Sequence, residues 1–200
     1  MAEQIAIAVL AKAPIAGFVK TRLAATLGAD GAATLQARLT AHAVATACAA
    51  AIGPVTLWAA PDVSHPTFVT LAQRHALSLA RQPDGDLGAR MLAAFAAANG
   101  PAVLIGSDCP ALTPRHLRIA AAHLRDGIDA VMLPAEDGGY VLIGLRQPQS
   151  ALFAGLAWST DSVAAETRRR MARLGLSWRE PAALWDIDRP EDLQRLQLPL

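Results

Sequence analysis

The sequence is poor in lysine, cysteine and aromatic residues. Its 200 residues include two lysines against 16 arginines, two cysteines, and only four Phe, four Trp and one Tyr. Two cysteines are too few for a disulfide scaffold and argue against a cysteine-based zinc site. The net charge is +1 and there is no basic tail, which argues against nucleic acid as the main partner.

Long membrane-like segments are also lacking. Residues 39–60 contain no Asp, Glu, Lys or Arg, but polar side chains interrupt this stretch and Gly53-Pro54 breaks it. The N-terminal apolar run, residues 5–11, is short and has no positive charge before it, so it is typical of a buried strand and not of a signal peptide. We therefore expect no membrane span and a cytoplasmic protein.

Alanine is abundant. It accounts for 45 of the 200 residues, in a chain that is 53% apolar and 18% charged. Such a composition predicts a folded protein whose core packs small residues against Leu, Ile and Val. The length fits one domain, so we expect residues 1–200 to fold as a single unit. Surface Ala and Leu would also permit a homodimer.

Short apolar runs alternate with helix-like segments along the chain. This order predicts an α/β fold, a mainly parallel sheet with helices on both faces, in which a short Gly-containing turn before residue 140 makes the sheet mixed. Ligands bind such sheets beyond the carboxyl ends of the strands. The expected strands are 5–11, 55–60, 76–80, 102–106, 130–133 and 140–145, with weaker ones at 176–178 and 184–187. The expected helices are 29–51, 67–75, 87–98, 114–125, 160–174 and 190–196.

The loop after the first strand contains both lysines of the chain. Glycine lets a backbone approach a ligand closely, hydroxyl and backbone groups donate hydrogen bonds, and cations neutralise charge, so this loop suits a phosphate group. The alternative is an ordinary exposed basic loop, since neither the Walker A nor the dinucleotide-binding glycine spacing is present. The residues proposed to bind phosphate are Lys12, Gly17, Lys20, Thr21 and Arg22.

Acidic residues follow three of the later strands. Asp108 follows the run 102–106 with only Ser107 between them, Asp137 follows 130–133, and Asp186 and Asp188 follow Leu184-Trp185. Carboxylates at this edge of a sheet can hold Mg²⁺ or Mn²⁺ together with phosphate oxygens. For each of them the alternative is a capped turn, but three acidic turns from distant parts of the chain support a shared site better than one does.

A glycine-containing turn opens the helix expected at 87–98. Gly88 would let a base or ribose approach the backbone, and Arg90 would reach a phosphate. A plain turn followed by a helical arginine explains the same residues equally well. We keep both interpretations.

Four segments together resemble a known family. They are AKAPIAGFVKTRL (11–23), LIGSDCPALTP (104–114), PAEDGGYVLIGL (134–145) with WSTD (158–161), and LWDIDRPEDL (184–193). The chain resembles the small bacterial GT-A-type, nucleotide-diphospho-sugar-transferase-like proteins, also called radical-SAM/selenodomain-associated transferases. It is more distantly similar to phospholactate guanylyltransferase and molybdenum-cofactor nucleotidyltransferases. The resemblance implies a GT-A fold, phosphate contacts at Lys20, Thr21 and Arg22, and a metal on Asp108.

Three functions are then compatible with the sequence. The first is glycosyl transfer from a nucleotide-diphosphate sugar to a small acceptor, with Mg²⁺ or Mn²⁺ on Asp108. Asp137 or Asp188 would act as the base. The second is a nucleotidyltransferase that joins a nucleoside triphosphate to a phosphorylated small molecule and releases pyrophosphate. A metal site formed by Asp108 and Asp188 together would fit this reaction well. The third is a nucleotide-binding module without turnover, supported only by the turn Ser107-Asp108-Cys109, which stands where glycosyltransferases of this fold often have an Asp-x-Asp pair.

Overall fold

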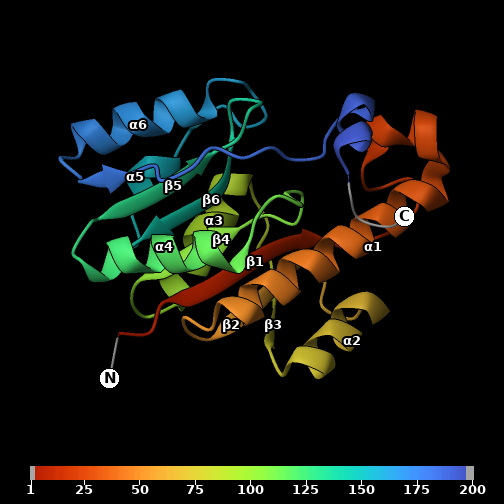
Figure 1. Ribbon diagram of the computed structural model, residues 1–200, viewed down its shortest axis with the longest axis horizontal. Helices are drawn as coiled ribbons and strands as arrows, with labels where there is room; N and C mark the ends of the chain where they lie inside the picture. Colours follow the sequence, from red (N-terminus) through yellow and green to blue (C-terminus); the bar gives the residue numbers. More distant parts are fainter. Residues whose placement is uncertain (1–2, 197–200) are drawn as a thin grey trace.

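The computed structural model describes residues 3–196 and has a seven-stranded sheet at its centre (Figure 1). The strand order is β3-β2-β1-β4-β6-β5-β7. Strand β6 runs antiparallel to β4 and β5, and the other paired strands are parallel, which confirms the predicted mixed sheet. The strands are β1 (Ala6–Lys12), β2 (Val55–Ala60), β3 (Ser78–Arg81), β4 (Ala102–Ile105), β5 (Ala130–Pro134), β6 (Tyr140–Leu145) and β7 (Trp178–Arg179).

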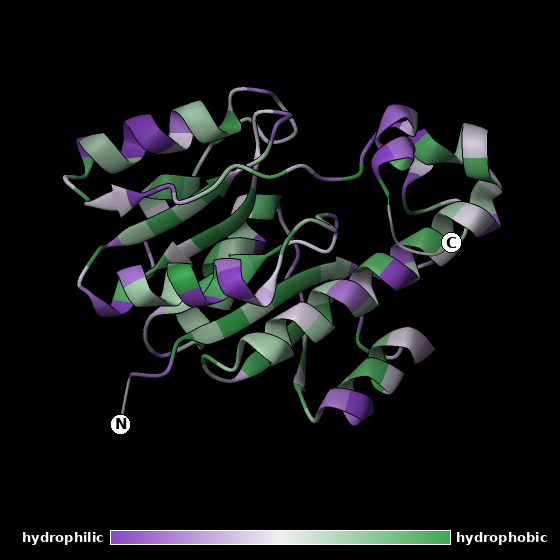
Figure 2. Ribbon diagram, in the orientation of Figure 1, coloured by the Kyte–Doolittle hydropathy of each residue, from purple (hydrophilic) through white to green (hydrophobic). Residues whose placement is uncertain are grey.

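Helices cover both faces of the sheet (Figures 1 and 2). Alternate residues of each strand point to opposite faces, so β1 buries Ile7 and Val9 on one side and Ala8 and Leu10 on the other. Helices α1, α2 and α4 cover the first face, and α3, α5 and α6 the second. The helices are α1 (Ala24–Ala50), α2 (Pro66–His75), α3 (Leu87–Ala97), α4 (Pro114–Arg125), α5 (Ser150–Phe153) and α6 (Val163–Arg173), with 3₁₀ turns η1 (Thr21–Leu23) and η2 (Pro190–Arg195).

Small residues allow these layers to pack closely. A Cβ on Gly53 would lie 2.3 Å from the Ile5 carbonyl oxygen, and one on Gly144 would lie 3.0 Å from Val103 Cγ1. The buried faces of α1 and α4 are likewise rich in alanine, which brings the helix backbones near the sheet. Within residues 3–196 no helix is both long and apolar enough to cross a membrane.

The structure corrects several predicted boundaries. Helix α1 begins at Ala24, earlier than the predicted residue 29, but Gly28 interrupts it with φ 72° and ψ 167°. Helix α6 starts at Val163 instead of residue 160, because the Thr160 hydroxyl bonds locally to the Ala157 carbonyl. Segment 190–196 is a 3₁₀ turn and not an α-helix, and the short elements α5 and η1 were not predicted.

The C-terminal segment 184–196 returns across the sheet to the start of α1 (Figure 1). The Leu184 backbone bonds to Pro134 and Glu136, which places it beside β5. Further along, the fully buried Ile187 packs with Leu23 and with Leu35 of α1. The segment therefore joins two parts of the molecule that are far apart in the sequence.

Replacement of Ile187 should test how strongly this segment is docked. Ile187→Ala removes a fully buried side chain and should lower the free energy of unfolding by about 3 kcal/mol. Denaturant melts would measure the loss. Leu174→Ala is the control, because Leu174 is 41% exposed and its truncation should cost little. Equal effects of the two variants would contradict the described docking.

Candidate functional site

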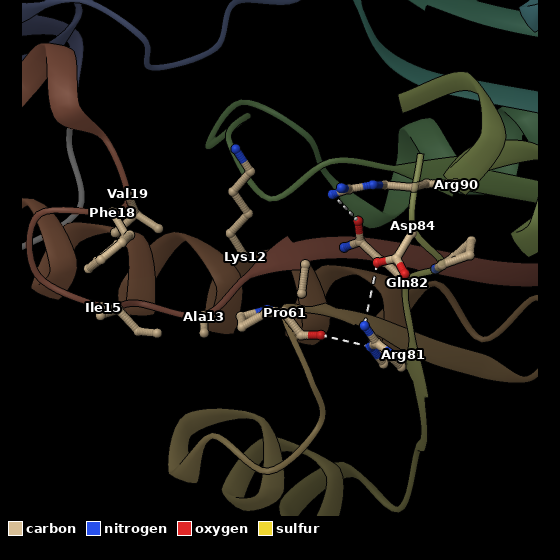
Figure 3. A pocket seen from close by; sticks show the side chains of 12 residues that line it. Lys12, Ala13, Ile15, Phe18, Val19, Pro61, Arg81, Gln82, Asp84 and Arg90 are labelled. Atoms are coloured by element: carbon tan, nitrogen blue, oxygen red, sulfur yellow. Dashed lines mark hydrogen bonds and ion pairs between the residues drawn. The ribbon is translucent and has the colours of Figure 1, made fainter. Parts of the chain in front are cut away.

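A cavity of about 450 Å³ lies beyond the carboxyl ends of β1, β2 and β3 (Figure 3). This is the edge at which open α/β sheets bind ligands. The volume falls within the range of small-molecule sites. The cavity is lined by Lys12, Ala13, Ile15, Phe18, Val19, Ala60, Pro61, Arg81, Gln82, Pro83, Asp84 and Arg90.

Gln82 fixes the shape of this cavity. It follows β3 directly and is 7% exposed. Its side-chain amide donates to the Ala11 carbonyl at 3.1 Å and to the Trp58 carbonyl at 2.8 Å, and its Oε1 accepts from Arg90 Nη1 at 3.4 Å. One side chain thus links β1, β2 and α3. Because its amide hydrogens are used, Gln82 is a structural element of the site.

Two cations face the open part of the cavity. Lys12 ends β1 and is exposed, and Arg90 lies in the first turns of α3, held also by the Gly85 carbonyl at 3.2 Å. Figure 3 shows both side chains extending to the same side of β1. Arg81, in contrast, is engaged by the Pro61 carbonyl and by Asp84. The structure thus brings the predicted Lys12 and Arg90 together in one cavity.

The opposite wall is apolar. Ile15 and Phe18 come from the loop after β1 and are 38% and 77% exposed, while the neighbouring Val19 is buried (Figure 3). The Phe18 amide donates to the Ile15 carbonyl at 3.0 Å, so the loop is held by its own backbone. An exposed phenyl ring beside a cavity offers a flat apolar surface to a ligand. Phe18 was not among the site residues predicted from the sequence, which were the charged residues, the glycine and the threonine of this loop.

A carboxylate pair, Asp108 and Asp137, acts electrostatically on Asp186 at the neighbouring part of the sheet edge. Asp108 follows β4, Asp137 lies in the β5–β6 turn, and Asp186 lies in the C-terminal segment. The pKa of Asp186 is raised to about 6, mainly by burial and then by the charges of Asp137 and Asp108. Within residues 3–196 no three His, Cys, Asp or Glu side chains lie close enough together to hold a metal ion. A cation here would need oxygens from another source.

Lys20 is occupied within the protein. Its Nζ lies 3.0 Å from Asp108 Oδ1 and donates to the Ile187 carbonyl, and its side chain is 6% exposed. The Asp108 side chain is 49% exposed, and its Oδ1 also accepts from the Ser107 hydroxyl at 3.2 Å. The Ile187 amide donates to the Asp108 carbonyl at 2.9 Å. This bond joins the C-terminal segment to the residues that follow β4.

Asp188 pairs with Arg22, and both side chains are largely exposed. From the sequence Asp188 was predicted as a metal ligand and as a candidate base, but Asp186, two residues earlier, is the residue on which Asp137 and Asp108 act. Both acids were visible in the motif. Their different surroundings depend on the tertiary packing of Ile187 between them.

The remaining predicted residues have local roles. Gly17 has φ +80° and open space around it, and Thr21 begins η1 on the surface. Gly88 lies outside the cavity lining, and a Cβ there would be 2.9 Å from both the Phe153 carbonyl oxygen and Trp158 Cζ2. The structure therefore gives Gly88 a packing role between α3 and the segment 153–158. Asp137 Oδ1 accepts the Gly139 amide at 2.8 Å, which shapes its own turn.

Cys109 is buried beside the carboxylates. Burial raises the pKa of its thiol to about 12, with the charges of Asp186 and Asp108 as smaller causes. A thiol that stays protonated at neutral pH is a poor nucleophile. Cys109 therefore fits the packing role expected from the sequence.

The fold is of the GT-A type that nucleotide-sugar transferases have. The chain belongs to the family of uncharacterized proteins conserved in bacteria (DUF2064), whose model matches residues 23–160. This confirms the resemblance inferred from the sequence motifs. Comparison with curated proteins gave no match.

Three solved structures illustrate the similarity. A candidate nucleotide-diphospho-sugar transferase from Desulfovibrio desulfuricans G20 is 29% identical, with a TM-score of 0.82 over 92% of this chain and 82% of the other. CMP:2-keto-3-deoxy-manno-octonic acid synthetase complexed with CTP is 13% identical, with a TM-score of 0.62 over 96% of both chains. Glucosyl-3-phosphoglycerate synthase from Mycobacterium tuberculosis, complexed with Mn²⁺ and UDP, is 12% identical, with a TM-score of 0.61 over 96% of this chain and 75% of the other. The last two show similarity of fold.

Asp186 gives a pH-dependent test of the carboxylate arrangement. Its folded pKa of about 6 exceeds the ordinary value of 3.8, so its deprotonation opposes folding as the pH rises through this interval. Asp186→Asn should therefore raise the free energy of unfolding of the metal-free protein by about 2 kcal/mol at pH 8 and by almost nothing at pH 3.5. Denaturant melts in EDTA at both pH values would measure this, with the exposed Asp126→Asn as control. A gain independent of pH would contradict the arrangement.

Proposed function

We propose that the protein transfers a glycosyl group from a nucleoside-diphosphate sugar to a small acceptor, with Mg²⁺ or Mn²⁺ as cofactor. The observation that supports this most is that the edge of the sheet carries an apolar part, a cationic part and an acidic part side by side. The cavity has an apolar wall at Phe18 and cations at Lys12 and Arg90, and carboxylates lie beyond the neighbouring strands. A nucleotide has the matching parts in the same order, an aromatic base followed by anionic phosphates.

The donor would bind with its base against Phe18 and Ile15 and its phosphates toward Lys12 and Arg90. Base–aromatic stacking and cation–phosphate pairing are the two interactions that these side chains offer. The Oε1 atom of Gln82 accepts a hydrogen bond from Arg90 and so holds the guanidinium group in position. The relatives complexed with CTP and with UDP and Mn²⁺ support a nucleotide ligand in this fold.

Asp108 and Asp186 would hold the divalent cation. Their carboxylate oxygens suit Mg²⁺ or Mn²⁺, which proteins often bind through one or two carboxylates plus the phosphates of the substrate. The lack of a three-residue ligand group within residues 3–196 agrees with such a shared site. The bound ion would supply positive charge next to the leaving phosphates.

Residues of the chain would assist both the departure of the diphosphate and the attack of the acceptor. As the bond between the sugar and the β-phosphate oxygen breaks, negative charge grows on the leaving diphosphate, and Lys12 and Arg90 would stabilise it. Asp137 is exposed in the β5–β6 turn, and we propose it as the base that takes the proton of the acceptor hydroxyl. Asp188, already paired with Arg22, would help to hold the C-terminal segment.

The alternative is nucleotidyl transfer with the same residues. An acceptor phosphate would then attack the α-phosphorus of a nucleoside triphosphate, and pyrophosphate would leave. The similarity in fold to a synthetase complexed with CTP favours keeping this candidate. The released product distinguishes the two reactions: a nucleoside diphosphate or pyrophosphate.

A thermal-shift panel of nucleotides and nucleotide sugars, with and without Mn²⁺, is the first experiment. A ligand present at 100 times its dissociation constant should stabilise the fold by about 2.7 kcal/mol. The proposal predicts stabilisation by at least one nucleotide, increased by Mn²⁺. If no nucleotide or nucleotide sugar shifts the melting temperature with or without Mn²⁺, the proposed function is wrong.

Phe18 should contribute to binding of the base alone. Phe18→Ala should weaken nucleotide binding by about tenfold, the usual worth of one base–aromatic stack, and leave pyrophosphate binding unchanged. Isothermal titration would measure both ligands. Val69→Ala is the matched control, because Val69 is 36% exposed on α2 and does not line the cavity. A parallel loss of nucleotide and pyrophosphate affinity would argue against stacking.

Asp108 should govern the metal dependence. Loss of one such electrostatic contact costs about 3 kcal/mol, so Asp108→Asn should lower Mn²⁺-dependent turnover by roughly a hundredfold. Initial rates at several Mn²⁺ concentrations would show this, once the panel has identified a donor. Asp126→Asn, an exposed carboxylate at the end of α4, should retain the rate. Full Mn²⁺-dependent activity in Asp108→Asn would refute the metal assignment.

A further inference from the structure

The two lysines of the chain are in opposite situations. Lys12 is exposed and extends into the cavity, and within residues 3–196 it forms no ion pair (Figure 3). Lys20 is buried to 6% exposure, with its ammonium group on Asp108 Oδ1 at 3.0 Å and on the Ile187 carbonyl. The two lysines therefore cannot bind a phosphate group in the same way. Lys12 is available at once, whereas Lys20 must first leave an internal partner.

That internal partner is the carboxylate proposed above to hold the divalent cation. Asp108 is half exposed, and in the described part of the chain no three His, Cys, Asp or Glu side chains form a metal site by themselves, with Asp108 or without it. An ammonium group in contact with this carboxylate neutralises it and repels a second positive charge nearby. In the free protein Lys20 and a divalent cation therefore compete for Asp108.

The loop around Lys20 permits a change of partner. Residues 15–18, which precede it, are exposed, and Gly17 has open space around it. Lys20 itself has φ 47°, at the point where the loop turns into η1. A bound phosphate would offer the ammonium group a stronger negative charge than the single carboxylate.

We propose that Lys20 exchanges Asp108 for a phosphate group of the incoming ligand, and that this exchange makes divalent-cation binding at Asp108 depend on the phosphate. The inference rests on the proposed function and adds an order to it: phosphate first, metal second. Because such coupling is reciprocal, a bound cation also favours phosphate. The free protein would thereby avoid holding a metal without its substrate.

The decisive variant is Lys20→Gln, which removes the charge and keeps an N–H donor for the Ile187 carbonyl. Removal of the competing charge should tighten Mn²⁺ binding to the ligand-free protein by about tenfold, while loss of the exchanged contact weakens pyrophosphate binding to the metal-free protein by about fivefold. Electron paramagnetic resonance of free Mn²⁺ measures the first, and equilibrium dialysis with labelled pyrophosphate the second. The two effects have opposite signs, whereas general damage to the site weakens both.

Lys12→Met is the matched control, since it should weaken pyrophosphate binding and leave Mn²⁺ binding unchanged. Thermal melts show whether each variant is folded, and Lys20→Met, with the same expected signs, replaces Lys20→Gln if the latter does not fold. Mn²⁺ binding that is unchanged or weaker in the Lys20 variant overturns the inference alone. If neither Mn²⁺ nor pyrophosphate binds any of the proteins, the proposed function and the inference fail together.

Discussion

The contact between the loop after β1 and the C-terminal segment is the interaction on which the site depends. Lys20 and Asp108 pair there, and the backbone of Ile187 bonds to both of them. The side chain of Ile187 is fully buried against the start of α1. Without this contact Asp186 would have no fixed position relative to Asp108, and the electrostatic effect of one on the other would be lost.

The rest of the site follows from the parallel order of β3, β2, β1 and β4. Parallel strands end at one edge, so the residues that follow each of them meet there. The first three strands supply an apolar and cationic cavity, and β4 supplies the carboxylate next to it. Gln82 links these parts from within, because its buried amide holds two strands and Arg90 at once. A ligand that spans both parts must carry an apolar face and several negative charges.

Sequence patterns predicted the fold well, because apolar runs and caps are local signals. Strands β2 and β6 and helix α4 have the predicted bounds, and the antiparallel β6 was expected from its short turn. One predicted boundary that differs, the start of α6, lies where the Thr160 hydroxyl forms a local hydrogen bond. Such bonds depend on a loop conformation that the pattern of residue types does not specify.

The site was predicted only in part. The scarcity of lysine drew attention to the right loop, but only the structure shows that Lys12 lines the cavity while Lys20 is buried on Asp108. Likewise Asp186 and Asp188 are equivalent in the motif, and packing separates their surroundings. These distinctions arise from contacts between residues that are far apart in the sequence, such as Lys20 and Asp108, and no spacing rule encodes them.

The central claim is that the cavity and the carboxylates form one site for a single nucleotide. The most direct measurement is a crystal structure of the protein with Mn²⁺ and the nucleoside diphosphate that stabilises it best. We expect the base to lie against Phe18, the phosphates to lie between Arg90 and the sheet edge, and Mn²⁺ to bind Asp108 and the phosphates together. A nucleotide bound outside this cavity, or Mn²⁺ bound away from Asp108, would contradict it.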